Sequence, residues 1–257
     1  ISCELSAAAL AALAALLPLP VRAAPAGSDT VIGGGRFRQL PQGETQFVLA
    51  KANSPGRAIA TAQSHFFPHG FAVHPGQPQR VAAFEKIGGG AGLFDVRDMR
   101  LLQVIAPRSG RQFYGHGAWS PDSKLLYSTE TIVASGSGAI GVRDGVSFEY
   151  LGDFPTYGDN PHDCHLIENG RVLAVTNGGG TAASGRRASL CYIDVATQKL
   201  LEKREMRDAR FNAGHVQVLA KRAAIVVSAP RKGLGTESLG AVSMCRAGGR
   251  LEVLQDP

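Results

Sequence analysis

The sequence predicts an all-β protein, a β-propeller built from four-stranded blades. Three observations support this fold class. A Pro or Gly followed by His recurs every 46 to 53 residues, and repeats of about 40–50 residues that hold several short strands are typical of propeller blades. The chain contains 32 glycines, which favours many turns. No helical periodicity of convincing length follows the first 26 residues.

The first half of each repeat predicts a β-hairpin. After the histidine come a short apolar strand, a polar turn and a second apolar strand, and the turns SPDSK and IENGR have the Asp, Asn and Gly content expected of hairpin loops. The four segments begin at Pro68, Gly115, Pro161 and Gly214, and their histidines are His69, His116, His162 and His215.

The second half of each repeat supplies two more strands. These are predicted within residues 91–107, 138–155 and 189–206, and residues 45–63 indicate an earlier, weaker blade. The sequence thus shows four clear blades and one partial blade. Its last unit lacks a strand that would clasp the first, so we expect residues 27–257 to form a propeller domain that is incomplete at its C-terminus.

The first 26 residues read as an export signal. An apolar run from Leu5 to Pro20 is followed by VRAAPA, which favours cleavage after Ala23 or Ala26, although a basic n-region is missing. The run is shorter than the roughly 20 residues of a membrane span, so no stable membrane insertion is expected. We therefore predict a periplasmic protein, with Cys3 removed together with the signal.

Charge and cysteine content exclude several classes of protein. The net charge is +6, but the basic residues are scattered or paired in predicted loops without aromatic neighbours, which argues against nucleic-acid binding. Cys164, Cys191 and Cys245 form no CxxC and are expected to be buried thiols. The GGG triplets at 33–35, 88–90 and 178–180 lack the lysine of a P-loop and are predicted to be blade loops; no GxSxG or CxxCH motif is present.

The segments YGHGAWSPDSKLLYSTE, GAIGVRD, PHDCHLIENGRVLAVTNGG and SLCYIDVATQKLLEK together resemble an uncharacterised family of exported bacterial proteins, a domain of unknown function. The resemblance runs from about Val31 to about Ala229. It implies a periplasmic seven-bladed propeller, often preceded by a twin-arginine signal and encoded beside imelysin-type and di-haem proteins of iron uptake. This sequence departs from that pattern: it lacks the twin arginines and the closing blades, and Asp163 and Cys164 replace a more usual Glu-Leu pair.

The repeated histidines are the main candidates for a functional site. If each one begins the innermost strand of its blade, all four point toward one end of the central channel, where neutral imidazoles hold Fe, Cu or Zn. The alternative is structural, with each histidine bonded to the backbone of its own blade. Possible additional ligands are Glu130, His165 and Asn177; a solvated turn or a cap explains Asp163 equally well.

Three functions remain open from the sequence. The first is a periplasmic binding or accessory protein linked to metal, mainly iron, acquisition, with an envelope protein as partner. The second is a metal-dependent hydrolase, because PHDCHLIENGRVLAVTNGG is also similar to a stretch of lactonase-type propellers. The third is an interaction scaffold without metal or turnover.

Overall fold

The computed structural model describes residues 30–38, 43–53, 57–181, 184–234, 239–246 and 248–254; the predicted signal segment and Cys3 lie outside them. The protein is all-β, with 60% strand and 2% helix. Within the described residues, the strands form one three-stranded and four four-stranded antiparallel sheets. The predicted fold class, a propeller of four-stranded blades, is confirmed.

The first sheet is ordered β1 (Thr30–Arg38), β2 (Thr45–Asn53) and β3 (Arg57–Ser64). The sequence indicated this partial blade only from residue 45 onward. Residues 33–35 were expected to form a loop, and this is wrong, because they pair with β2 in the middle of β1. A Cβ atom at Gly34 would collide with the carbonyl of Pro68, so glycine is required here by the close approach of β1 to the next sheet.

The four complete blades follow one another along the chain, and in each the strands are adjacent in sequence order. The first two blades consist of β4 (Pro68–Val73), β5 (Arg80–Glu85), β6 (Ala91–Asp95) and β7 (Arg100–Val104), then β8 (Arg111–Trp119), β9 (Leu125–Ile132), β10 (Ser137–Asp144) and β11 (Tyr150–Asp159). The last two consist of β12 (Pro161–Ile167), β13 (Val172–Asn177), β14 (Ser189–Asp194) and β15 (Leu200–Glu205), then β16 (Val216–Val218), β17 (Ala224–Ser228), β18 (Ala241–Cys245) and β19 (Glu252–Val253).

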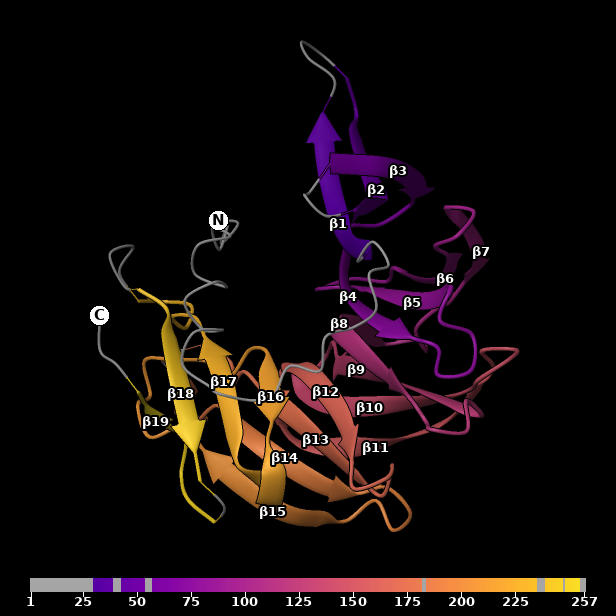
Figure 1. The fold of residues 1–257 in the computed structure, drawn as a ribbon. Helices are drawn as coiled ribbons and strands as arrows, with labels where there is room; N and C mark the ends of the chain where they lie inside the picture. Colours follow the sequence, from indigo (N-terminus) through magenta and orange to yellow (C-terminus); the bar gives the residue numbers. More distant parts are fainter. Residues whose placement is uncertain are drawn as a thin grey trace.

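The blades are arranged in an arc around their first strands. Figure 1 shows β4, β8, β12 and β16 toward the inside of the arc and the fourth strands toward its outside. The inner strands are in contact in the order β4, β8, β12, β16. The four hairpins that begin with a histidine therefore fold as predicted and bring the same end of each repeat to the centre.

The hydrophobic core lies between blades rather than within one sheet. Along β13, Leu173 and Val175 pack against the second blade, whereas Val172 and Ala174 pack against the fourth. Both faces of the strand are buried, because side chains alternate between the two faces of a sheet. This explains why the strand reads as the continuous apolar run VLAV rather than as an apolar–polar alternation.

The hairpin turns follow from their residues. In IENGR, Glu168, Asn169 and Gly170 all have positive φ values, of 51°, 56° and 83°. In SPDSK, the Ser120 hydroxyl donates to Asp122 Oδ1 over 2.6 Å and accepts the amide of Leu125 over 2.9 Å. Such local bonds hold the ends of the two strands in register.

Among the described residues, three arginines depart from the expected solvated surface: Arg143, Arg204 and Arg231 are buried. Arg231 is only 3% exposed, and its guanidinium donates to the carbonyls of Gly179, Thr181 and Ala209. The sequence predicts a solvated loop at this position. It does not indicate the carbonyls that bind the guanidinium, because they are some 20 to 50 residues distant along the chain. In the described part of the chain, no helix has the length and apolar character needed to cross a membrane.

Candidate metal centre

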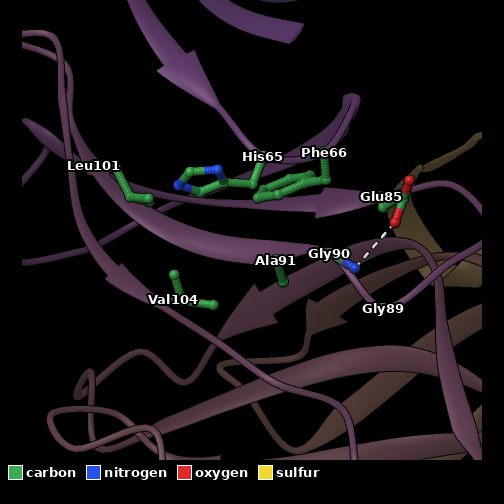
Figure 2. A pocket seen from close by; sticks show the side chains of 8 residues that line it. All are labelled: His65, Phe66, Glu85, Gly89, Gly90, Ala91, Leu101 and Val104. Carbon is green, nitrogen blue, oxygen red and sulfur yellow. Dashed lines mark hydrogen bonds between the residues drawn. The ribbon is translucent and has the colours of Figure 1, made fainter. Parts of the chain in front are cut away.

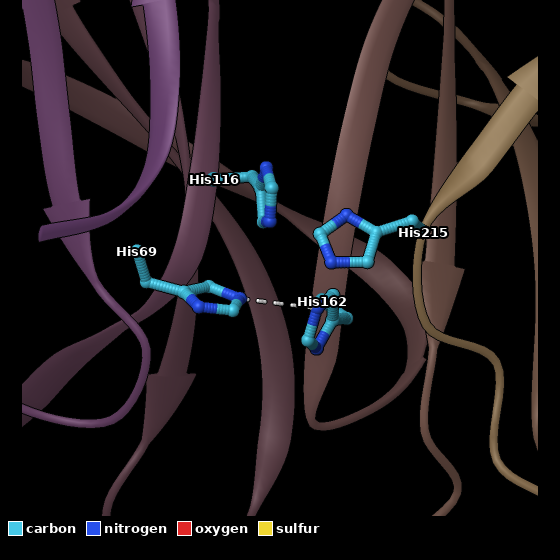
Figure 3. A group of neighbouring side chains, drawn as sticks. All are labelled: His69, His116, His162 and His215. Atoms are coloured by element: carbon cyan, nitrogen blue, oxygen red, sulfur yellow. Dashed lines mark hydrogen bonds between the residues drawn. The ribbon is translucent and has the colours of Figure 1, made fainter. Parts of the chain in front are cut away.

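The four repeated histidines lie on or beside the inner strands, and His116 lies within its strand rather than at the start. His69, His116 and His162 belong to β4, β8 and β12, and His215 directly precedes β16. In the first three strands the pairing with the neighbouring strand shifts register at the histidine. Such an irregularity frees the backbone locally and changes the direction of a side chain. Figure 3 shows that the four imidazoles, one from each blade, point toward one another.

The distances are compatible with a single metal ion. One ring nitrogen from each histidine lies within 4.8 Å of those of the other three. His69 Nε2 and His162 Nε2 are 3.5 Å apart. Ligands at 2.0–2.1 Å from a tetrahedral metal are separated by about 3.4 Å. Small side-chain rotations therefore convert this arrangement into a four-coordinate site.

The electrostatic environment keeps the four imidazoles neutral. Burial lowers the pKa of each of the four below its usual value of 6.5, and other imidazoles of the cluster lower it further for His69, His116 and His162. Asp163 opposes this shift at His116 and His215 without reversing it. The pKa of His69 falls to about 3 and that of His116 to about 4. A neutral imidazole offers a nitrogen lone pair, which is the form that binds metal. The cluster is thus a set of four uncharged nitrogen donors.

Asp163 is a buried carboxylate beside this cluster. Its Oδ1 lies 3.3 Å from His116 Nδ1, while its Oδ2 accepts from His165 Nε2 over 3.2 Å and from the amide of Val216 over 3.0 Å. His215 Nδ1 lies 3.9 Å from Oδ2. Burial opposes its ionisation, but the hydrogen bond from His165 and the nearby imidazoles hold its pKa below the usual range. The interpretation of Asp163 as a solvated turn or cap is therefore wrong.

The contact with Asp163 fixes the tautomer of His116. An ionised carboxylate can only accept a hydrogen bond, so the Nδ1 that faces it at 3.3 Å carries the ring proton and Nε2 carries the lone pair. That Nε2 is buried and finds no hydrogen-bond partner among the residues that the structure describes. A carboxylate that orients a histidine in this way is the usual outer partner of a metal-bound imidazole. The unpartnered nitrogen is the strongest single sign of a ligand at this site.

The three additional candidates occupy different places. His165 is half exposed and joins the cluster only through Asp163. Glu130 is fully buried, 2.7 Å from Arg143, and accepts the hydroxyl of Ser128 over 2.9 Å. Asn177 donates to the carbonyl of Thr156 over 3.1 Å. The structure thus brings together four of the seven candidates and assigns Glu130 and Asn177 to contacts within and between blades.

One pocket lies beside the inner strands, and another lies toward the outer strand of the first blade. One, of about 270 Å³, adjoins the cluster: His116, Asp163 and His165 line it together with apolar residues of β4, β8 and β12. The other, of about 370 Å³, lies among the residues labelled in Figure 2, where Glu85 Oε2 accepts the amide of Gly90 over 2.9 Å. None of the four clustered histidines lines this second pocket.

Comparison with known proteins gives a family and a fold. The family described as "Protein of unknown function (DUF1513)" matches residues 67–257. The search of curated proteins finds no match. Among solved structures, the hydrazine synthase of Kuenenia stuttgartiensis is similar, with a TM-score of 0.63 and 15% sequence identity over 82% of this chain and 62% of that chain. The chain thus spans less than two thirds of that protein chain, and the similarity shows the fold alone.

Proposed function

We infer that this chain, which belongs to the DUF1513 family of proteins of unknown function, binds one transition-metal ion between His69, His116, His162 and His215. The observation that carries this proposal is the convergence of four neutral imidazoles, one of which has a buried nitrogen without a partner among the described residues. A purely structural role for the histidines does not explain why this nitrogen is left unbonded, because a buried polar atom without a partner costs free energy.

The donor set indicates the class of metal. Four imidazoles without thiolate suit Zn²⁺, Cu²⁺, Ni²⁺ or iron, and among divalent ions the affinity of such a site rises from iron to copper. We extend the proposal to a binding or accessory role in periplasmic metal handling, with iron as the cargo and an envelope protein as partner. This extension rests on the signal-like first 26 residues and on the family resemblance.

Metal analysis of the purified protein tests the proposal. We expect one equivalent of metal after loading with Zn²⁺, Cu²⁺ or, without oxygen, Fe²⁺, and none in the variant that carries both His116→Ala and His162→Ala. His65→Ala is the matched control, because His65 is exposed and lies outside the cluster. Retention of one equivalent by the double variant would refute the four-histidine site.

A second candidate function is hydrolysis at a metal-bound water, as in metal-dependent hydrolases. The 270 Å³ pocket beside His116, together with the hydrogen-bonded Asp163 and His165, favours it. The test is turnover of lactones and esters by metal-loaded protein. His165→Gln should abolish turnover and leave metal content unchanged; absence of turnover in the wild-type protein excludes this candidate.

A further inference from the structure

A buried threonine hydroxyl joins the inner strands of the second and third blades at the level of the histidines. Thr129, on β9, is fully buried. Its Oγ1 accepts the amide of His116 over 3.2 Å and lies 3.0 Å from the carbonyl of His116 and 3.3 Å from that of His162. One hydroxyl therefore contacts the backbone of two metal-site histidines from two different blades.

The next blade repeats this arrangement. Thr176, on β13, is also fully buried. Its Oγ1 accepts the amide of Asp163 over 3.0 Å and donates to the carbonyl of Gly214 over 2.6 Å. Gly214 directly precedes His215, so this hydroxyl joins the third blade to the fourth at the same level. Each threonine follows the residue whose amide it accepts by 13 positions.

The irregular strand pairing explains why hydroxyls are needed here. The register shifts of β8 and β12 withdraw the backbone of His116 and Asp163 from the regular ladder. A buried amide or carbonyl without a partner is costly, and the threonines supply the missing partner. Between the first and second blades the solution is different: a Cβ at Gly70 would collide with the carbonyl of Gly115, so glycine permits direct backbone approach there.

We propose that Thr129 and Thr176 are positioning residues of the four-histidine site. Their hydroxyls set the separation of neighbouring inner strands, and thereby the distances between imidazoles that belong to different blades. The inference rests on the proposed metal site, and nothing in the sequence of a single repeat indicates it, because each threonine also contacts the following blade. Removal of either hydroxyl should change the geometry of the site without removing a ligand.

The variants Thr129→Val and Thr176→Val remove the hydroxyl and keep the side-chain shape. We expect each to weaken Zn²⁺ binding, measured by competition with a chromophoric chelator, at least 10-fold, as loss of an outer partner typically does. The electron paramagnetic resonance spectrum of the Cu²⁺-loaded protein should also change. Thr129→Ser and Thr176→Ser retain the hydroxyl and should restore both the affinity and the spectrum.

Thr131→Val is the matched control. Thr131 lies on the same strand and the same face as Thr129 and is buried, but within the described part of the protein its hydroxyl has no partner. If Thr129→Val and Thr176→Val lose stability to denaturant but keep the wild-type Zn²⁺ affinity and Cu²⁺ spectrum, the positioning role is overturned. If instead the wild-type protein itself binds no metal, the proposed function fails, and the two failures are thereby distinguished.

Discussion

Replacement of Asp163 by Asn tests whether the buried carboxylate prepares His116 for metal. Three nitrogens lie within 3.3 Å of the carboxylate: His165 Nε2 and the amide of Val216 donate to Oδ2, and His116 Nδ1 faces Oδ1. An amide has one acceptor oxygen. If this oxygen takes the place of Oδ2 and accepts from His165 and Val216, the NH₂ group faces His116 Nδ1.

The consequence follows from the tautomers of imidazole. Opposite an NH₂ group, His116 Nδ1 becomes the acceptor and the proton moves to Nε2, which removes the lone pair that would bind metal. Metal binding then requires the unfavourable tautomer. We expect the affinity for Zn²⁺ to fall 10- to 100-fold, which corresponds to about 1.4–2.7 kcal/mol. The metal-free protein should lose about 1 kcal/mol of unfolding free energy through one weakened hydrogen bond.

The assay is a competition titration of Zn²⁺, with denaturant unfolding of the metal-free protein measured in parallel. Asp159→Asn is the control, because Asp159 pairs with Arg186 near the surface over 2.6 Å, and such pairs contribute about 0–1 kcal/mol. A Zn²⁺ affinity of Asp163→Asn within twofold of wild type would refute the argument that the carboxylate selects the tautomer.

Three further predictions concern stability and reactivity. The pKa values of His69 and His116 are about 3 and 4, below 6.5 in the unfolded chain, so the unfolded state binds more protons below pH 6.5. The unfolding free energy of the metal-free protein should fall on acidification by about 1 kcal/mol per pH unit for each group, and a constant value from pH 7 to 5 would contradict this. Leu173→Ala empties a fully buried position between two blades and should cost about 2–5 kcal/mol in denaturant unfolding; a loss below about 1 kcal/mol would mean that this interface is not tightly packed. Burial raises the pKa of the Cys164 thiol, and it raises the pKa of the Cys191 thiol to about 11. Peptide mapping after iodoacetamide treatment should therefore find both cysteines unlabelled until the protein is denatured; labelling of the native protein would show that they are accessible.

Much of the architecture could be predicted from the sequence because it is local. Each repeat by itself specifies its hairpin strands, their polar turns and the position of its histidine. Because that position is equivalent in each complete blade, His69, His116, His162 and His215 meet at one centre. The strand at residues 30–38 was not predicted, since Gly34 permits close approach to the backbone of Pro68 rather than forming a turn.

The outer parts of the site could not be predicted because their partners belong to other blades. The sequence around Asp163 favours a turn or a cap, whereas its contacts are with His116 of the second blade and Val216 of the fourth. Glu130 is different, because its partner Arg143 lies on the neighbouring strand of its own blade, where it holds the carboxylate inside the sheet. No pattern within one repeat specifies the contacts of Asp163.

Each blade contributes one histidine, and consecutive ligands are 46 to 53 residues apart in the chain. An unfolded chain therefore offers no short segment in which two of these four imidazoles bind one ion together. A metal that binds at this centre selects the assembled protein, and at a free concentration 100 times its dissociation constant it stabilises that state by about 2.7 kcal/mol. Metal would thus stabilise only correctly assembled molecules. Protein whose four blades have not come together would bind no metal at this centre and would remain the less stable fraction.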